Sequence, residues 1–208
     1  MLGWHPKLGA TQSWPPIFKN FAANVAESVT FRDNSHIFRE VQLPPVTTTA
    51  PGAESPSPTI RQAVRADLLA VFQIEQASFP QPWPFSALES YLGEDGFLVA
   101  ETDNDDGDPP AVAGYVIADT VPNHGTPLGH VKDLAVRPSY RRRGVASALL
   151  KRALAVLDAT GAGSVKLEVR ADNDGARRLY RRFGFEHRKT IPNYYSNGAD
   201  ALVMVRLL

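Results

Sequence analysis

The residues whose types and spacing suit chemistry most directly are three consecutive arginines followed by a glycine, at positions 141–144. The apolar, β-branched stretch 131–136 before them indicates a buried strand, which Pro138 ends. Apolar side chains then recur at helical spacing, at Val145, Ala146, Leu149, Leu150, Ala153, Leu154 and Leu157. Glycine lets a backbone approach a ligand closely, and a helix start offers unpaired N–H groups at the positive end of its dipole. The loop between this strand and this helix therefore suits a pyrophosphate group.

The elements that must position this loop begin at Thr59. The pattern predicts strands at 59–63, 97–102 and 112–119, with a helix capped by Asp67 and a second helix at 87–92 capped by Ser86. The first helix is expected to bury a stripe made of Leu68, Leu69, Phe72 and Ile74. Between the two helices, prolines at 80, 82 and 84 stiffen a loop that carries aromatic side chains.

The chain beyond the central helix continues the alternation. Glycines at 161 and 163 end that helix, and 164–170 alternates as a strand with Glu168 on one face. A turn at 171–174 caps a further helix that Gly184 stops, and strands at 185–188 and 201–207 close the chain. Helices that alternate with strands indicate an α/β or mixed α+β protein with a partly parallel sheet.

Residues 1–58 do not show the pattern of a packed domain. Their aromatic residues lack sustained periodicity, and the stretch PPVTTTAPGAESPSP has the composition of a flexible linker. We expect 1–58 to form a disordered N-terminal extension with a Pro/Thr/Ser-rich linker, and 59–208 to form the domain. An over-extended translation start or a small docking arm would each account for the extension.

Composition and charge limit the classes of function. The chain has 22 Lys and Arg against 22 Asp and Glu, so its overall charge does not argue for a nucleic-acid partner. The absence of cysteine excludes disulfides, cysteine-based zinc sites and a cysteine acyl-enzyme, and it is compatible with a reducing cytoplasm. The five histidines form no metal-spaced cluster, and no run approaches the roughly 20 apolar residues of a membrane span. We therefore expect a cytoplasmic protein with no metal, nucleic-acid or membrane partner.

Four stretches of the chain carry a resemblance to a known family. The motif Arg141-x-x-Gly144-x-Ala146, within DLAVRPSYRRRGVASALL, resembles the R/Q-x-x-G-x-G/A motif of the GNAT acetyltransferases. Together with IEQASFPQPW, LEVRADNDGARRLYRRFGF and NYYSNGADALVM, it resembles the RimI-type, or ribosomal-protein-alanine, N-α-acetyltransferases and their archaeal relatives. One departure is Ala199, where the family often has an acidic residue. The resemblance implies the GNAT-like fold, a central mixed, partly parallel and twisted sheet flanked by helices.

The resemblance also implies acetyl-CoA as co-substrate and residues that hold it. The pantetheine arm would pair with the backbone of Leu134, Ala135 and Val136, and Asn173 would bond the pantetheine side as well. The pyrophosphate would meet the loop and the helix start, at Arg142, Arg143, Gly144, Val145, Ala146 and Ser147. Arg141 belongs to the same motif, although it could equally be a solvated loop charge.

The chemistry of acetyl transfer to an amine requires a base and an acid. A protein α-amino group has a pKa of about 7.7–8.0, far below the value of about 10.4 for lysine, so a modest base suffices. By resemblance, Glu168 is the candidate base and Tyr180 the candidate acid. Their alternative roles are an ion pair with Lys166 or Arg170 for Glu168, and packing against Phe183 for Tyr180. Without a cysteine, direct transfer in a ternary complex is favoured over a covalent enzyme intermediate.

The acceptor is expected to be a protein or peptide N-terminus, for example that of a ribosomal protein. Aromatic side chains that could wall its slot are Phe79, Trp83, Tyr194 and Tyr195. Two other readings remain open at this point, a GNAT enzyme that acetylates a small amine and a non-catalytic acyl-CoA-binding module.

Overall fold

The structure is a computed structural model that describes residues 57–102, 111–123 and 125–208. The expectation of a disordered extension and linker therefore falls almost wholly on residues that lie outside the described part of the chain. The described residues belong to one compact unit, Pro51–Leu208.

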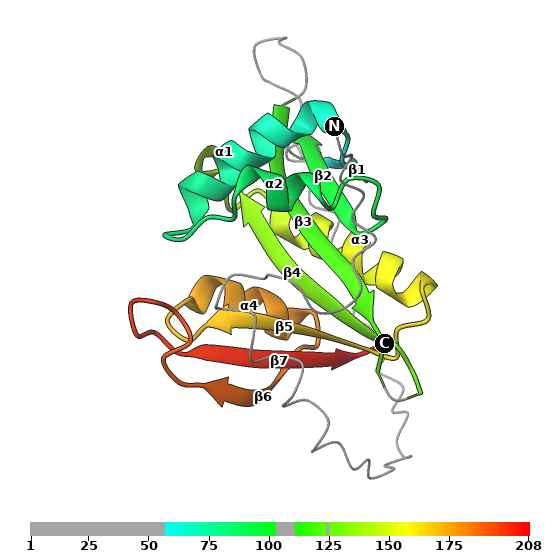
Figure 1. The fold of residues 1–208 in the computed structure, drawn as a ribbon, viewed down its shortest axis with the longest axis vertical. Helices are drawn as coiled ribbons and strands as arrows, with labels where there is room; N and C mark the ends of the chain where they lie inside the picture. The colour runs from blue at the N-terminus through cyan, green and yellow to red at the C-terminus, as the bar shows by residue number, and fades with distance from the viewer. Residues whose placement is uncertain (1–56, 103–110, 124) are drawn as a thin grey trace, which may run out of the picture. The chain divides into compact units, whose positions relative to one another are not determined.

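Within the described residues, seven strands form one sheet in the order β1-β2-β3-β4-β5-β7-β6 (Figure 1). Their bounds are β1 Thr59–Gln62, β2 Phe97–Thr102, β3 Ala111–Val121, β4 Leu128–Val136, β5 Ser164–Arg170, β6 Glu186–Ile191 and β7 Ala201–Leu207. Neighbouring strands are antiparallel except β4 and β5, which are parallel. The prediction of a mixed, partly parallel sheet is confirmed.

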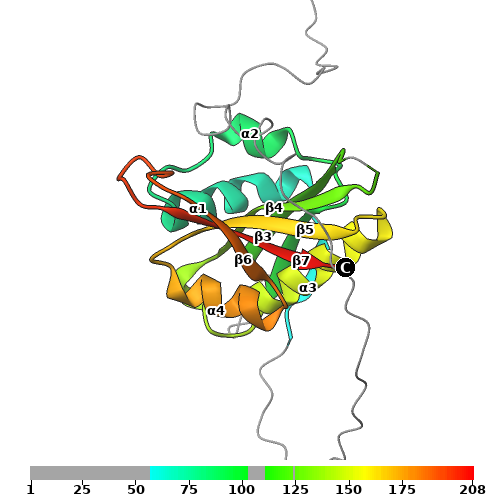
Figure 2. The same ribbon diagram turned by 90° about the horizontal axis from the view of Figure 1, so that it is seen from below.

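Helices cover both faces of this sheet (Figure 2). Helices α1 (Leu68–Ser78) and α2 (Phe85–Glu89) lie on one face, and α3 (Val145–Ala159) and α4 (Asp174–Arg182) on the other. Short 3-10 turns, η2 (Arg65–Asp67) and η3 (Pro138–Tyr140), precede α1 and α3. The predicted apolar face of the central helix packs as expected, because Leu149, Leu150 and Ala153 are completely buried. Each face of the sheet thus has its own apolar core.

The sheet opens between β4 and β5. The two strands pair only from Leu128↔Ser164 to Val131↔Leu167. Beyond that point β4 stays with β3 and β5 stays with β7, so the two strands diverge (Figure 1). A β-bulge accompanies the divergence, because the β3–β4 register skips Lys132. Bulges bend a strand and re-aim its side chains. The divergence leaves one edge of β4 from Lys132 to Val136 without a paired strand.

The first helix differs from its predicted form. Leu69, expected in the buried stripe, is 63 % exposed, and the buried side chains of α1 are Leu68, Val71, Ile74 and Glu75. The apolar face is therefore rotated from the predicted one and includes a carboxyl group. The second helix begins at Phe85, behind Pro84, so Ser86 is not its cap.

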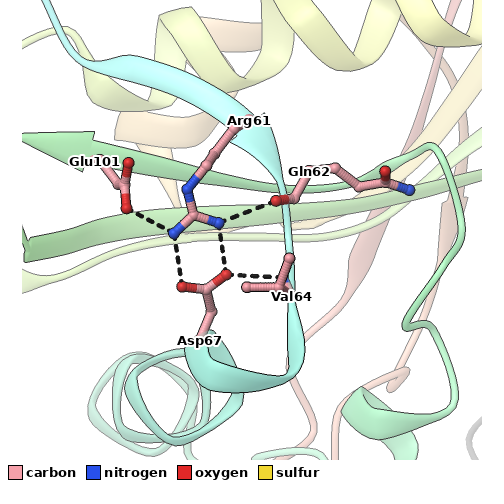
Figure 3. A network of polar contacts seen from close by, with 5 residues as sticks. All are labelled: Arg61, Gln62, Val64, Asp67 and Glu101. Carbon is pink, nitrogen blue, oxygen red and sulfur yellow. Dashed lines mark hydrogen bonds and ion pairs between the residues drawn. The ribbon is translucent and has the colours of Figure 1, made fainter.

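Asp67 does not cap α1 through its side chain but joins a network around Arg61 (Figure 3). The Arg61 guanidinium donates to both Asp67 oxygens, at 2.7 and 2.8 Å, and to Glu101 Oε1 at 2.6 Å. Asp67 Oδ2 also accepts from the backbone N–H of Val64 at 2.8 Å. The network connects β1, β2 and the start of α1, and so fixes where α1 crosses the sheet.

Candidate active site

The arginine-glycine loop before α3 forms a concave backbone turn. Arg142 and Gly144 adopt left-handed conformations, with φ of 66° and 83°. Helix α3 starts directly after Gly144, and no side chain caps it. The backbone N–H groups of its first turn therefore point toward the loop without a hydrogen bond from a capping side chain. Nothing lies within 4 Å of the place where a Cβ on Gly144 would stand. A turn of this kind in front of a helix dipole is suited to a diphosphate, so the residues present fit that part of coenzyme A.

The exposed edge of β4 leads into this loop. Leu134, Ala135 and Val136 pair with β3 on one side only, at Val116, Tyr115 and Gly114. Because β5 has diverged, the other edge is available to an extended ligand that adds to the strand as a peptide would. This edge fits the amide-bearing pantetheine arm.

Arg141 lies away from the backbone turn and braces the structure beside it. Its Nε donates to the carbonyl oxygen of Val136 at 3.0 Å, and its Nη2 lies 3.5 Å from Ser78 Oγ at the end of α1. Arg141 therefore links the end of β4 to α1. The carbonyl oxygen of Val136, one of the three residues whose backbone is expected to pair with the pantetheine arm, already accepts this hydrogen bond.

Glu168 lies at the point where β5 leaves β4, next to a histidine. His130 Nε2 is 2.7 Å from Glu168 Oε2, and Lys166 Nζ is 3.6 Å from Glu168 Oε1. The side chains of Glu168 and His130 are each 13 % exposed. The alternative ion pair with Lys166 is thus present, but the shorter contact is with His130.

The electrostatics of this pair favour a neutral imidazole beside a carboxylate. Burial lowers the pKa of His130 below its ordinary 6.5, and Glu168 offsets only part of that effect. Burial acts to raise the pKa of Glu168, but the hydrogen bond from His130, the charge that His130 carries at acidic pH, and the charge of Lys166 outweigh it, so this pKa lies below its ordinary value. At neutral pH the Nε2–H of His130 donates to the carboxylate, and Nδ1 carries the lone pair. A Glu–His pair of this kind can accept a proton.

His130 was missed by the sequence reasoning. The predicted strand began at 131, whereas β4 begins at Leu128 and includes His130. Its closeness to Glu168 depends on the parallel register, in which His130 lies opposite Lys166. A single sequence does not reveal that register, so no signal in the chain pointed to the pair.

Tyr180 lies on α4 and is buried in the apolar core on the face of the sheet that α3 and α4 cover. Its ring meets Phe185 edge-on, with centroids 5.9 Å apart, and Phe183 packs against the same apolar cluster. Burial raises the pKa of Tyr180, and the ionised forms of Asp133 on β4 and of Tyr195 add to the effect at a pH where they exist. The phenol therefore keeps its proton throughout the neutral range and lies within electrostatic reach of the diverging part of β4.

Asn173 is the N-cap of α4, within the turn at 171–174 that was predicted to cap this helix. Its Oδ1 accepts from the backbone N–H of Ala176 at 3.1 Å. The carbonyl end of the side chain is used by the helix, which leaves the amide nitrogen as its donor toward a ligand.

The four aromatic residues expected to wall the acceptor slot lie in two groups. Trp83 stacks on Tyr91, with ring centroids 5.8 Å apart, and Phe79 packs against the core under α1 and α2. Tyr194 and Tyr195, between β6 and β7, meet edge-on at 5.1 Å, and Arg170 lies 4.8 Å above the Tyr195 ring. Burial raises the pKa of both tyrosines to about 12, and the charge of Glu168 contributes. Both views place the α1–α2 loop and the β6–β7 connection at the same end of the domain (Figures 1 and 2).

The described residues carry neither a metal-binding cluster nor a membrane-spanning helix. No three His, Cys, Asp or Glu side chains within residues 57–102, 111–123 and 125–208 are grouped so as to hold a metal ion. Among the helices described, none has the length and apolar character needed to cross a membrane.

Comparison with known families identifies the chain. The model of the acetyltransferase (GNAT) family matches residues 68–185. This protein belongs to the GNAT acetyltransferase family, and it is an acetyl-CoA-dependent N-acetyltransferase.

Its relatives include enzymes of protein N-termini. An uncharacterized N-acetyltransferase of Methanocaldococcus jannaschii is 35 % identical over 150 residues, 71 % of this chain and 90 % of the relative. An N-alpha-acetyltransferase of Sulfurisphaera tokodaii is 32 % identical over 156 residues, with 70 % and 90 % covered. The ribosomal protein bS18-alanine N-acetyltransferase of Escherichia coli is 32 % identical over 149 residues, with 70 % and 95 % covered. The archaeal and bacterial enzymes are therefore about equally similar to this chain.

Solved structures agree with the fold. Ard1 from Thermoplasma volcanium superposes with a TM-score of 0.64 at 29 % identity and covers 74 % of this chain and 99 % of its own. Arabidopsis thaliana NAA60, solved with acetyl-CoA, has a TM-score of 0.65 at 22 % identity and covers 73 % and 100 %. The GNAT-like fold expected from the sequence is confirmed.

Proposed function

We propose that this protein acetylates the α-amino group of a protein N-terminus, and that an alanine-first terminus such as that of a ribosomal protein is its acceptor. The observation that supports an α-amine is the Glu168–His130 pair, a base whose imidazole pKa lies below 6.5. Deprotonating a lysine-like ammonium with this base costs about 3.5 kcal/mol more than deprotonating an α-ammonium, because their pKa values are about 10.4 and 7.7–8.0. The E. coli and archaeal relatives support the protein acceptor.

The cofactor side of the proposal rests on backbone groups. The N–H groups from Arg142 to Ser147 would hold the diphosphate, and the exposed edge of β4 would hold the pantetheine arm. Asn173 would donate from its amide nitrogen to the same arm. Acetyl-CoA supplies a thioester carbonyl that an amine can attack. The open edge of β4 would place that carbonyl next to Glu168, where β4 and β5 diverge.

The protein's own groups then take part in three proton transfers. His130 and Glu168 accept one proton from the incoming ammonium, directly or through a water molecule. Tyr180 donates its proton to the departing sulfur, since its buried phenol is fully protonated at neutral pH. As the tetrahedral intermediate collapses to the amide, the nitrogen loses its second proton, and this proton restores the phenol of Tyr180 through solvent. With no cysteine in the chain, the amine attacks the thioester directly in a ternary complex.

A panel assay tests this function. Purified full-length protein with acetyl-CoA is given peptides that differ in their first residue, an N-terminally blocked lysine peptide, and polyamines. We expect the free α-amine peptides to react at least tenfold faster than the blocked peptide and the polyamines, with alanine-first peptides the fastest. Preference for a polyamine would contradict the α-amine proposal, and equal rates for all first residues would contradict the alanine proposal.

A further inference from the structure

Three buried polar side chains that the mechanism does not use form a cluster under the acceptor loop, here residues 79–84. They are Glu75 on α1, Tyr115 on β3 and Asp133 on β4, with exposed fractions of 1, 0 and 9 %. The Tyr115 hydroxyl contacts Glu75 Oε2, and it lies 2.8 Å from Asp133 Oδ2. One phenol oxygen is therefore within hydrogen-bond distance of two carboxyl groups.

This geometry requires an additional proton. A phenol has one proton to donate, and an ionised carboxylate can only accept. If Tyr115 donates to one carboxyl group, the other can approach the phenol oxygen only as a donor, in its protonated form. The cluster therefore holds two protons, the one of the phenol and one more on a carboxyl group.

Asp133 is the group best placed to hold that proton. Burial raises its pKa well above the ordinary value, and the charge of Glu75 adds to the effect. The titratable groups that face Asp133 from the packed elements are Glu75 from α1, Tyr115 from β3 and Tyr180 from α4. The hydrogen bond with Tyr115 and, to a smaller extent, the N–H of Leu134 on its own strand lower this pKa, but they offset the effect only in part.

The cluster also connects two parts of the site. Glu75 Oε1 accepts the backbone N–H of Trp83 at 2.6 Å, which ties the acceptor loop to the cluster. Asp133 directly precedes the β4 edge at Leu134–Val136. A break at any of the three side chains would therefore remove the polar link between the acceptor loop and the strand that borders the cofactor.

We propose that Glu75, Tyr115 and Asp133 are positioning residues that share one additional proton, and that this proton keeps the acceptor loop seated on β4. The proposal rests on the proposed function for its kinetic consequence: loss of the proton weakens acceptor binding and leaves acetyl-CoA binding unchanged. When the proton leaves, two buried carboxylates face a single phenol, and their repulsion releases the loop.

The kinetic test compares wild type with Asp133→Asn as the pH is raised. The amide has the same shape and donates an N–H to Tyr115, but it has no proton to lose. We expect the acceptor KM of wild type, divided by that of Asp133→Asn, to rise about tenfold between neutral and alkaline pH, the effect of one pKa unit of coupling. Titration of the peptide's own amine cancels in this ratio. A flat ratio, or an equal change in the KM for acetyl-CoA, would overturn the proposal.

A second measurement does not depend on catalysis. In a Trp4→Phe/Trp14→Phe background, Trp83 is the one remaining tryptophan and reports on the acceptor loop by its fluorescence. We expect an alkaline transition that Asp133→Asn abolishes. Tyr115→Phe should show the released-loop spectrum already at neutral pH, with folding checked by circular dichroism. If the transition persists in Asp133→Asn, the proton is not the one proposed. If the transition behaves as expected while no peptide is acetylated, the proposed function fails and the cluster stands.

Discussion

At the scale of single residues, the chemistry depends on the protonation states of three side chains. His130 is neutral, Glu168 is ionised and Tyr180 is protonated at neutral pH, and each state follows from burial and from named neighbours. The base and the acid approach the diverging strands from opposite faces of the sheet, which suits a reaction in which the amine enters from one side and the thiolate leaves toward the other.

Removal of the carboxylate beside the imidazole should slow catalysis. We expect Glu168→Gln to lower kcat by about 10²-fold or more, since general-base catalysis contributes about 10²–10⁴-fold. In wild type, kcat/KM should fall on the acid side of the profile, at a pH below 6.5. The reason is that the pKa of His130 lies below 6.5, so the imidazole is unprotonated above that pH. A pH–rate profile measures both effects. If Glu168→Gln has the turnover of wild type and the same fall of kcat/KM at acidic pH, Glu168 has no role in the mechanism.

The phenol of Tyr180 can be tested separately from binding. We expect Tyr180→Phe to reduce kcat by about 10²-fold while the Kd for acetyl-CoA changes less than about twofold, since only the proton donor is lost. Calorimetric titration gives the Kd and steady-state kinetics give kcat. Turnover equal to wild type would show that another group protonates the thiolate.

At the scale of elements, the start of α3 carries the cofactor side. Gly144 has φ of 83° with open space around its absent side chain, so alanine there would strain the backbone without a clash. We expect Gly144→Ala to cost about 1–2 kcal/mol of stability and to raise the Kd for acetyl-CoA, because the N–H groups of the turn are displaced. Thermal unfolding and titration with CoA are the measurements.

The same helix offers a control for this substitution. Gly161, after the end of α3, has φ of 80° and equally open space. Gly161→Ala should show the same loss of stability with no change in the Kd for acetyl-CoA. A similar loss of CoA affinity in both variants would mean that strain in α3, rather than the turn at Gly144, is responsible.

The sequence predicted elements better than the relations between them. Strand 164–170 and the capping turn at 171–174 before α4 were correctly placed, because alternation and capping are local signals. Leu69 was misplaced because its neighbours fit two helical faces equally well, and the face that wins carries Glu75. The pairing of His130 with Glu168 depends on the parallel register of β4 and β5, and the contact of Tyr115 with Asp133 depends on the antiparallel register of β3 and β4. Neither is a property of a local sequence window.

At the scale of the whole domain, ion pairs hold the α1 face in place. The hydrogen bonds from Arg61 lower the pKa of Asp67, although burial opposes them. A depressed carboxyl pKa contributes stability above the unfolded-state value of about 3.9, and that contribution is lost as the pH falls through the folded-state pKa. We expect Asp67→Asn to destabilise the domain by about 1–2 kcal/mol at pH 7 and by less below pH of about 4. Denaturant unfolding at the two pH values measures the difference. A deficit independent of pH would show that the carboxylate charge is not the cause.

The measurement that tests the central claim most directly is the position of the acetyl group on a peptide that offers both kinds of amine. An alanine-first peptide with an internal lysine is incubated with acetyl-CoA and the full-length protein, and tandem mass spectrometry locates the modification. The Glu168–His130 base predicts acetylation of the α-nitrogen with the lysine left free. Acetyl on the lysine side chain, or equal amounts on both nitrogens, would contradict the account.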